Sequence, residues 1–184
     1  MTSDSSSLST VAWAQLVPEL LVADIEKSLR FWRDLCGFAV LFDRPDEGFA
    51  YLDLGGAQIM LDERTRTRNW ETGPMENPFG RGVNFQVRVL AIEPVLAALA
   101  RAGWPLFMEP EQKWYRTGDV ETGVHQFLVQ DPDGYLVRFS AYIGERPCGH
   151  AGSTGYHRQC RRGEVHTCPR GGCSAAASRA LPRE

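Results

Sequence analysis

The sequence predicts an α+β fold in which two βαβββ modules follow one another and form a curved mixed sheet around a central cavity. The main observation is that the order strand, helix, three strands occurs twice along the 184 residues. The two occurrences also share residues at a spacing of roughly 67, which is too long for a solenoid repeat and fits a duplicated module. The matching residues are Val22-x-x-Ile25-Glu26-x-x-Leu29 and Val89-x-x-Ile92-Glu93-x-x-Leu96, each followed by a glycine, Gly37 or Gly103.

The first module is predicted over about residues 14–62. A strand at Gln15–Val22 leads to Asp24, a residue type that commonly caps helix N-termini. The helix runs to about Leu35, because apolar residues recur at spacings of three and four, and Gly37 ends it. Three strands are then expected at Phe38–Phe42, Gly48–Leu54 and Ala57–Asp62, with a Gly55-Gly56 turn between the last two.

The second module is predicted over about residues 82–142, after a polar loop at 63–81. It begins with a strand at Val83–Val89 and a helix at Ile92–Ala102. Further strands are expected at Pro105–Met108, Trp114–Thr117, Val124–Gln130 and Tyr135–Tyr142, with a turn at Glu109–Lys113. The turn before the last strand is Asp131-Pro132-Asp133-Gly134. Proline pre-sets φ there, aspartate can bond its own backbone, and glycine supplies a positive φ.

Charge divides the chain into an acidic body and a basic tail. Residues 1–145 contain 13 Lys and Arg against 21 Asp and Glu, a balance of −8, whereas residues 146–184 contain 7 Arg against 2 Glu, a balance of +5. An acidic body argues against nucleic acid as a partner and is compatible with a cationic ligand. The sequence has neither an apolar run of membrane-spanning length nor a secretory signal, so we expect a cytoplasmic protein with no membrane partner.

The two ends of the chain are expected to be disordered. Residues 1–12 are rich in Ser and Thr, and residues 146–184 combine Gly, Arg, Ser and Ala with few large apolar side chains. The tail holds four cysteines near histidines, but no Cys-x-x-Cys pair of the kind that binds zinc. The remaining cysteine, Cys36, is expected in the core. The folded domain is therefore predicted at 13–145.

These residues resemble the vicinal oxygen chelate superfamily, which includes glyoxalase I, extradiol dioxygenases and bleomycin-resistance proteins. The resemblance covers about residues 14–142 and implies the glyoxalase/bleomycin resistance fold. It rests on the repeated βαβββ order and on three short motifs. The motifs are Leu21-Val22-Ala23-Asp24 at the first helix, Phe31-Trp32 within it, and Asp131-Pro132-Asp133-Gly134 before the last strand.

The resemblance also implies where a catalytic metal would lie. Metal-dependent members present ligands from the first and last strand of each module, which fall here near Val17, Met60, Asn84 and Arg138. None of these residues is a histidine, and arginine cannot ligate a metal. We therefore expect no metal, no cofactor and no catalytic residue.

The first strand and the position of Arg138 are similar to the bleomycin-resistance branch, because Pro18-Glu19-Leu20 and an arginine replace metal ligands. That similarity implies a homodimer that binds a cationic glycopeptide drug of the bleomycin type and confers resistance. Two alternatives remain open. One is a metal-dependent glyoxalase-like or dioxygenase-like enzyme with atypical ligands, and the other is a carrier or sensor of another small molecule.

Six side chains are the candidate ligand-binding residues. Aromatic rings can hold flat or cationic ligands, and carboxylates can pair with a cation, although each side chain can equally serve packing or face water. Arg138 is expected to pair with a carboxylate, Glu19 or Asp62, if it faces the cavity. His125, the single histidine of the body, is expected to be a half-exposed packing residue. The six candidates are Glu19, Asp62, Trp70, Trp114, Tyr115 and Arg138.

Overall fold

The computed structural model describes residues 11–64, 66 and 70–148 of the chain. The predicted disordered segments therefore fall mostly outside the described residues, at 1–10 and 149–184. Within the described residues the chain forms two four-stranded mixed sheets, both open, one from each half of the sequence. The predicted α+β fold of two βαβββ modules is confirmed. Among the described residues no helix is long and apolar enough to cross a membrane.

The first module begins with β1 (Glu19–Val22), which leads into α1 (Ile25–Leu29). Asp24 caps this helix as predicted, because its side chain accepts a hydrogen bond of 3.1 Å from the Lys27 amide. The helix continues as a π-helical segment at Arg30–Leu35. The module is completed by β2 (Ala39–Arg44), β3 (Phe49–Leu54) and β4 (Ala57–Glu63), giving the sheet order β1-β4-β3-β2.

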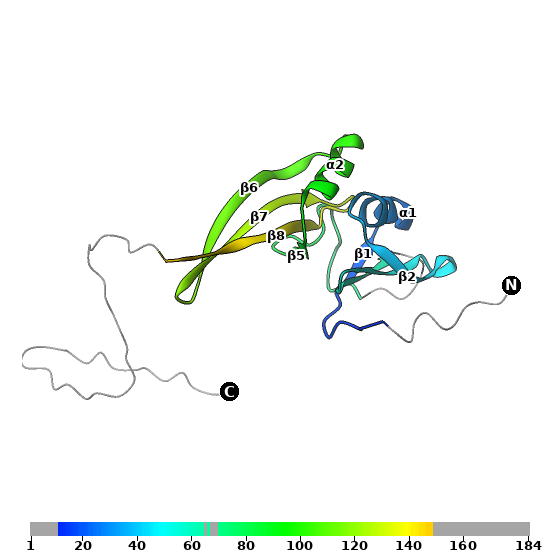
Figure 1. Ribbon diagram of the computed structural model, residues 1–184. Coiled ribbons are helices and arrows are strands. Elements are labelled where there is room, and N and C mark those ends of the chain that lie inside the picture. Colours follow the sequence, from blue (N-terminus) through cyan, green and yellow to red (C-terminus); the bar gives the residue numbers. More distant parts are fainter. Residues whose placement is uncertain (1–10, 65, 67–69, 149–184) are drawn as a thin grey trace, which may run out of the picture. The chain divides into compact units, whose positions relative to one another are not determined.

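The second module contains β5 (Asn84–Val89) and α2 (Glu93–Arg101). Its other strands are β6 (Leu106–Thr117), β7 (Val120–Gln130) and β8 (Leu136–Pro147), giving the sheet order β5-β8-β7-β6. Figure 1 shows β6, β7 and β8 as long ribbons side by side. β8 continues past the expected domain end at 145.

The predicted turn at Glu109–Lys113 is wrong, because these residues belong to the continuous strand β6. The pairing of β6 with β7 shifts register between Leu106 and Met108 and again between Met108 and Glu111. β6 is also an edge strand, and an edge or a bulge is where a sheet tolerates a proline such as Pro110. A polar, proline-containing stretch that looked like a turn is therefore a bulged edge.

Each sheet packs one face against the helices, and the two packed faces share one apolar cluster. The largest fully buried side chains include Phe31, Trp32, Phe127 and Phe139, and Cys36 is buried among them as predicted. Burying a large apolar side chain stabilises a fold by roughly 1.5–3 kcal/mol. The opposite face of each sheet does not pack against a helix of the described residues. We call this face the helix-free face of that sheet.

The Asp131-Pro132-Asp133-Gly134 turn joins the two modules. Asp131 accepts hydrogen bonds from the amides of Asp133 and Tyr135, at 3.0 and 2.8 Å, which closes the turn. Asp133 reaches back to the first module, where it accepts from the Ala23 amide at 3.1 Å. Tyr135 donates from its hydroxyl to the Leu21 carbonyl at 3.1 Å. The turn that helped to predict the fold from the sequence therefore also holds the two modules together by hydrogen bonds.

Candidate functional site

The helix-free face of the first sheet carries two of the predicted site residues. Strand partners share a face, and here Glu19 pairs with Met60, Met60 with Tyr51, and Tyr51 with Phe42. Asp62 follows Met60 by two residues and so lies on the same face. Glu19 is exposed, whereas Asp62 is 6% exposed. The sheet therefore brings both carboxylates beside a row of aromatic rings.

The aromatic rings of this face form a contiguous cluster. Phe42 stacks on Tyr51 with ring centroids 5.1 Å apart, and Trp13 meets Tyr51 edge-on at 5.4 Å. The Trp13 side chain remains 48% exposed. Beside them, the Arg44 guanidinium lies 3.7 Å from the ring centroid of Phe49. The sequence reasoning missed these rings, although aromatic residues at alternate positions of β3 were a signal for them.

Tyr51 keeps its phenolic proton on this face. Burial, followed by the negative charge of Asp53, raises the pKa of Tyr51 above its ordinary value. The hydroxyl donates a hydrogen bond of 2.9 Å to Gln58. Gln58 in turn holds the segment before β1, because it accepts from the Ala14 amide at 2.8 Å. This network keeps the segment that contains Trp13 against the sheet.

The helix-free face of the second sheet contains a separate pocket of about 210 Å³. Its floor follows the strand register, in which Gln86 pairs with Arg138 and Gln126 pairs with Ser140. Two predicted site residues, Tyr115 and Arg138, meet here. The lining residues are Gln86, Tyr115, Val124, Gln126, Arg138 and Ser140.

Hydrogen bonds organise most of the polar groups in this pocket. Gln126 is buried, and its amide donates to the Tyr115 hydroxyl at 2.8 Å and to the Glu111 carboxylate at 2.9 Å. Arg138 donates from Nη2 to Gln86. The Nε atom of Arg138 is buried and has no hydrogen-bond partner among the described residues. The pocket therefore holds a donor that the described part of the protein does not use.

The prediction that Arg138 pairs with the carboxylate of Glu19 or Asp62 is wrong. Among the ion pairs of the described residues, none joins Arg138 to Glu19 or Asp62, and its acceptor is Gln86. The reason is the register of the second sheet, which sets Gln86 directly beside Arg138. Glu19 and Asp62 lie on the first sheet instead.

The remaining candidates lie apart from both groups. Trp114 precedes Tyr115 on β6 and so points to the opposite face, where the Arg146 guanidinium lies 4.2 Å from its ring centroid. Trp70 lies in the loop between the modules and is 68% exposed. The structure thus joins four of the six candidates into two pairs, one on each sheet.

His125 has the packing role that was predicted. It is half-buried on β7, and its Nδ1 lies 3.5 Å from the Glu93 carboxylate at the start of α2. The contact links the second helix to its own sheet, away from both helix-free faces.

Comparison with known proteins agrees with this architecture. The family model of the Glyoxalase/Bleomycin resistance protein/Dioxygenase superfamily matches residues 11–139. The chain belongs to this superfamily. A solved structure of a superfamily member from Vibrio splendidus 12B01 has 38% sequence identity, covering 68% of this chain and 95% of that chain with a TM-score of 0.32. No curated protein matches the chain.

Two further solved structures resemble the fold of this superfamily member. TioX from Micromonospora sp. ML1 has 20% identity and a TM-score of 0.56, covering 72% of this chain and 100% of that chain. A virulence protein from Salmonella typhimurium has 20% identity and a TM-score of 0.54, covering 72% of this chain and 99% of that chain. At this identity the likeness concerns the fold alone.

The residues of this superfamily member do not fit a catalytic metal at the expected positions. The strand register corrects two of these positions, because it sets Glu19 rather than Val17 beside Met60, and Gln86 rather than Asn84 beside Arg138. Of the four paired side chains only the Glu19 carboxylate is a usual metal ligand. Among the described residues no group of three or more His, Cys, Asp or Glu side chains is arranged to hold a metal ion.

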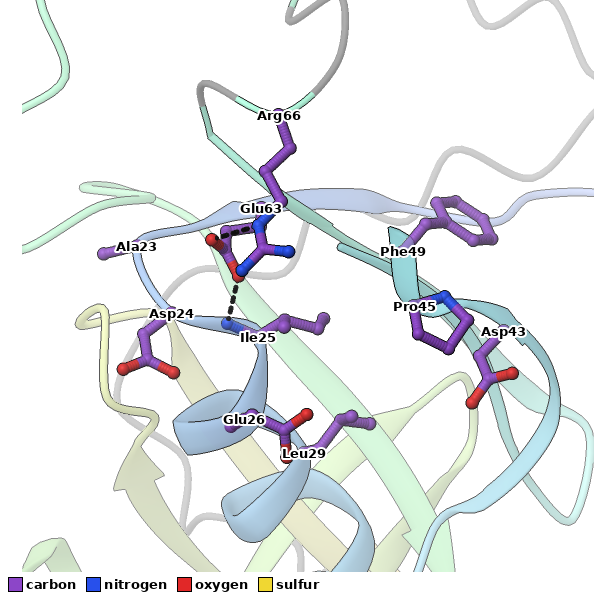
Figure 2. Close-up of a pocket in the computed structure, with 10 residues that line it drawn as sticks. All are labelled: Ala23, Asp24, Ile25, Glu26, Leu29, Asp43, Pro45, Phe49, Glu63 and Arg66. Atoms are coloured by element: carbon purple, nitrogen blue, oxygen red, sulfur yellow. Dashed lines mark hydrogen bonds and ion pairs between the residues drawn. The ribbon is translucent and has the colours of Figure 1, made fainter. Parts of the chain in front are cut away.

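A third cavity, of about 310 Å³, lies at the start of α1 (Figure 2). Two of the four carboxylates that line it, those of Asp24 and Glu63, already have structural partners. Glu63 accepts from the Ile25 amide at 3.1 Å and from Arg66 at 2.7 Å, and Asp24 caps the helix. None of the six predicted site residues lines it. The two helix-free faces are therefore the better candidates for ligand binding.

Proposed function

We propose that this protein is a metal-free binding protein that sequesters a cationic glycopeptide antibiotic of the bleomycin type and so confers resistance to it. The supporting observation is the first helix-free face, where the carboxylates of Glu19 and Asp62 lie beside a cluster of aromatic rings. This combination suits a ligand that has both a positive charge and flat rings.

The physical argument rests on two attractions that act together. A cation above an aromatic ring gains roughly 0.5–2 kcal/mol, depending on how completely water is excluded, and Trp13 offers an exposed ring of this kind. A neighbouring carboxylate, such as the exposed one of Glu19, adds Coulomb attraction. The negative balance of the body raises the local concentration of a cationic ligand.

We further propose that the protein acts as a homodimer. Each chain offers one acidic, aromatic face and one face with Arg138, and they belong to different sheets. In the proposed dimer, the first face of one copy and the second face of the other line one groove. Two copies then form two equivalent grooves, as expected for a symmetric dimer.

Calorimetric titration of the purified protein with bleomycin tests the binding function directly. We expect saturable heat with about one drug molecule per subunit. Heat within noise at protein and drug concentrations on the order of tens of micromolar contradicts the proposal. Resistance is tested by growth of a sensitive host with and without the expressed protein.

Metal analysis of the same purified protein tests the enzymatic alternative. A stoichiometric divalent ion together with lyase or dioxygenase activity would contradict a metal-free binding role. Saturable binding of bleomycin that is unchanged after treatment with a chelator supports it. The apoprotein and the untreated protein are titrated in parallel, so that each serves as the control for the other.

A further inference from the structure

The pocket on the second helix-free face has a different chemistry from the first. We propose that it is a second site, which binds a small molecule with a planar carboxylate. The inference goes beyond the proposed function, which concerns a cationic drug. The carboxylate compound and the drug are different molecules, so the two sites can be tested separately.

The argument begins with the unused donor of Arg138. A buried N–H without an acceptor is unfavourable, because it has left water and gained no hydrogen bond in return. Gln86 accepts from Nη2 and leaves Nε without a partner among the described residues. An oxygen that enters the pocket can satisfy Nε once the guanidinium turns to expose this atom, and a carboxylate suits a guanidinium because its two oxygens match the planar fork.

The other lining groups favour the same ligand group. Ser140 supplies a hydroxyl, and the Gln86 side chain supplies an amide N–H₂ beyond the oxygen that Arg138 uses. Val124 and the Tyr115 ring provide apolar surface for the carbon atoms next to a carboxylate. A cavity of about 210 Å³ has room for a small planar group and not for a whole drug.

The charges around the pocket are consistent with an anionic group. Arg138 is the charged residue among the six described residues that line it. The nearest carboxylate in the hydrogen-bond network is Glu111, which lies outside the lining and is held by the buried amide of Gln126. The pocket therefore contains the positive charge of Arg138, while the neighbouring carboxylate of Glu111 is already hydrogen-bonded to Gln126.

The probe for the test is benzoate, with benzyl alcohol as the matched uncharged compound. Nitrogen-15 NMR of the full-length protein observes the Nε–H signal of Arg138, which is assigned by its absence in Arg138→Lys. We expect benzoate to shift this signal saturably, with half-saturation on the order of 1 mM for a fragment of this size. Benzyl alcohol should leave it in place. A signal that does not move with benzoate overturns the proposal.

Two variants give an independent readout by ligand-observed NMR. Arg138→Met should weaken benzoate binding at least about tenfold, since a hydrogen bond to a charged group is lost. Arg146→Met is the control, because Arg146 lies on the same strand but contacts Trp114 and Glu121 outside the pocket. Equal benzoate affinity in Arg138→Met and wild type overturns the proposal even if the variant is less stable.

A carboxylate could also come from Glu19 of a second copy, and this source is distinguished in the same experiment. If Glu19→Gln shifts the Arg138 Nε–H signal of the ligand-free protein and benzoate does not, the pocket is an intersubunit contact and the subsite is overturned. Failure of bleomycin binding with a normal benzoate response removes the drug from the proposed function and leaves the subsite intact. The reverse result removes the subsite alone.

Discussion

The indole nitrogen of Trp32 donates a hydrogen bond of 3.2 Å to the carboxylate of Asp131, and both side chains are buried. Trp32 belongs to the helix of the first module and Asp131 to the turn of the second. Because a buried acceptor without its donor is costly, this bond makes the two modules depend on each other for stability.

Replacing Trp32 by Phe should therefore destabilise the folded protein. The substitution keeps an aromatic ring in the core but removes the donor to Asp131, and we expect a loss of about 1–3 kcal/mol of unfolding free energy. Urea unfolding followed by circular dichroism measures it. Trp70→Phe is the control, because Trp70 is 68% exposed, and it should change stability by less than about 0.5 kcal/mol. Equal effects of the two substitutions would contradict the role of the bond.

Asp131 should also make stability depend on pH. Burial is the main cause that raises the pKa of Asp131 to about 7, against the lowering effect of its hydrogen bonds. A raised pKa of an acid means that the folded state prefers the protonated form. The contribution of Asp131 to the free energy of unfolding is therefore largest below about pH 4, and it is lost as the pH rises toward 7.

Asp131→Asn isolates this contribution, because it cannot ionise. The stability of wild type relative to the variant should fall between about pH 4 and 7, by roughly 4 kcal/mol at most for a difference of about three pKa units. Urea titrations of both proteins at intervals across this range measure the difference. A difference that stays constant with pH would show that Asp131 titrates alike in the folded and unfolded states.

Gly134→Ala should be more harmful than an alanine at another glycine with positive φ. Gly134 has φ of 87°, and an added Cβ would collide with the Cβ of Pro78. Gly82 has φ of 85° with no atom within 4 Å of an added Cβ, so it is a matched control. We expect about 1 kcal/mol of destabilisation at Gly82 and at least about 2 kcal/mol more at Gly134, measured by urea unfolding. Similar losses would argue against a close contact with Pro78.

Trp13→Ala should weaken bleomycin binding roughly 3- to 30-fold, the equivalent of losing one cation–π contact. Calorimetry or fluorescence titration measures the dissociation constant. Leu90→Ala is the control, because Leu90 is fully exposed and lies in the connection between β5 and α2, outside both sheets. A wild-type dissociation constant in Trp13→Ala would remove the aromatic cluster from the binding site.

Mixing two variants tests whether each groove is shared between copies, provided that each variant alone binds bleomycin, the titrated ligand, more weakly than wild type. If Trp13→Ala and Arg138→Met subunits form a heterodimer, one shared groove carries both changes and the other carries neither. The mixture should therefore recover wild-type affinity in about a quarter of all sites, since about half of the dimers are mixed. Titration after denaturation and refolding together, compared with the separately refolded variants, measures the recovery. Grooves formed within one chain would show none.

The fold was predictable because its signals are local. The spacing of apolar residues predicts the helices. The residue types of the Asp131-Pro132-Asp133-Gly134 segment, an aspartate, a proline and a glycine, are typical of a tight turn. The strand β6 was split in two because its solvated, proline-containing middle has the composition of a turn. Only the pairing with β7 distinguishes a bulged edge strand from a loop, and pairing is not encoded in the strand itself.

The candidate site was less predictable because it depends on register between distant strands. Tyr51 and Phe42 meet across β3 and β2, and Trp13 joins them from the segment before β1. Likewise Gln86 became the acceptor of Arg138 through the parallel pairing of β5 with β8. Residue types could suggest a carboxylate partner for Arg138, but not which side chain the sheet would set beside it.

The two helix-free faces have opposite chemistry, although their modules repeat one pattern of strands and helix. Glu19 occupies the same place in its module as Gln86 does in the other, and Met60 the same place as Arg138. Equivalent places of the repeated module thus carry different side chains. If each face binds a ligand as proposed, substitutions on one face can change what that face recognises while the other face stays as it is.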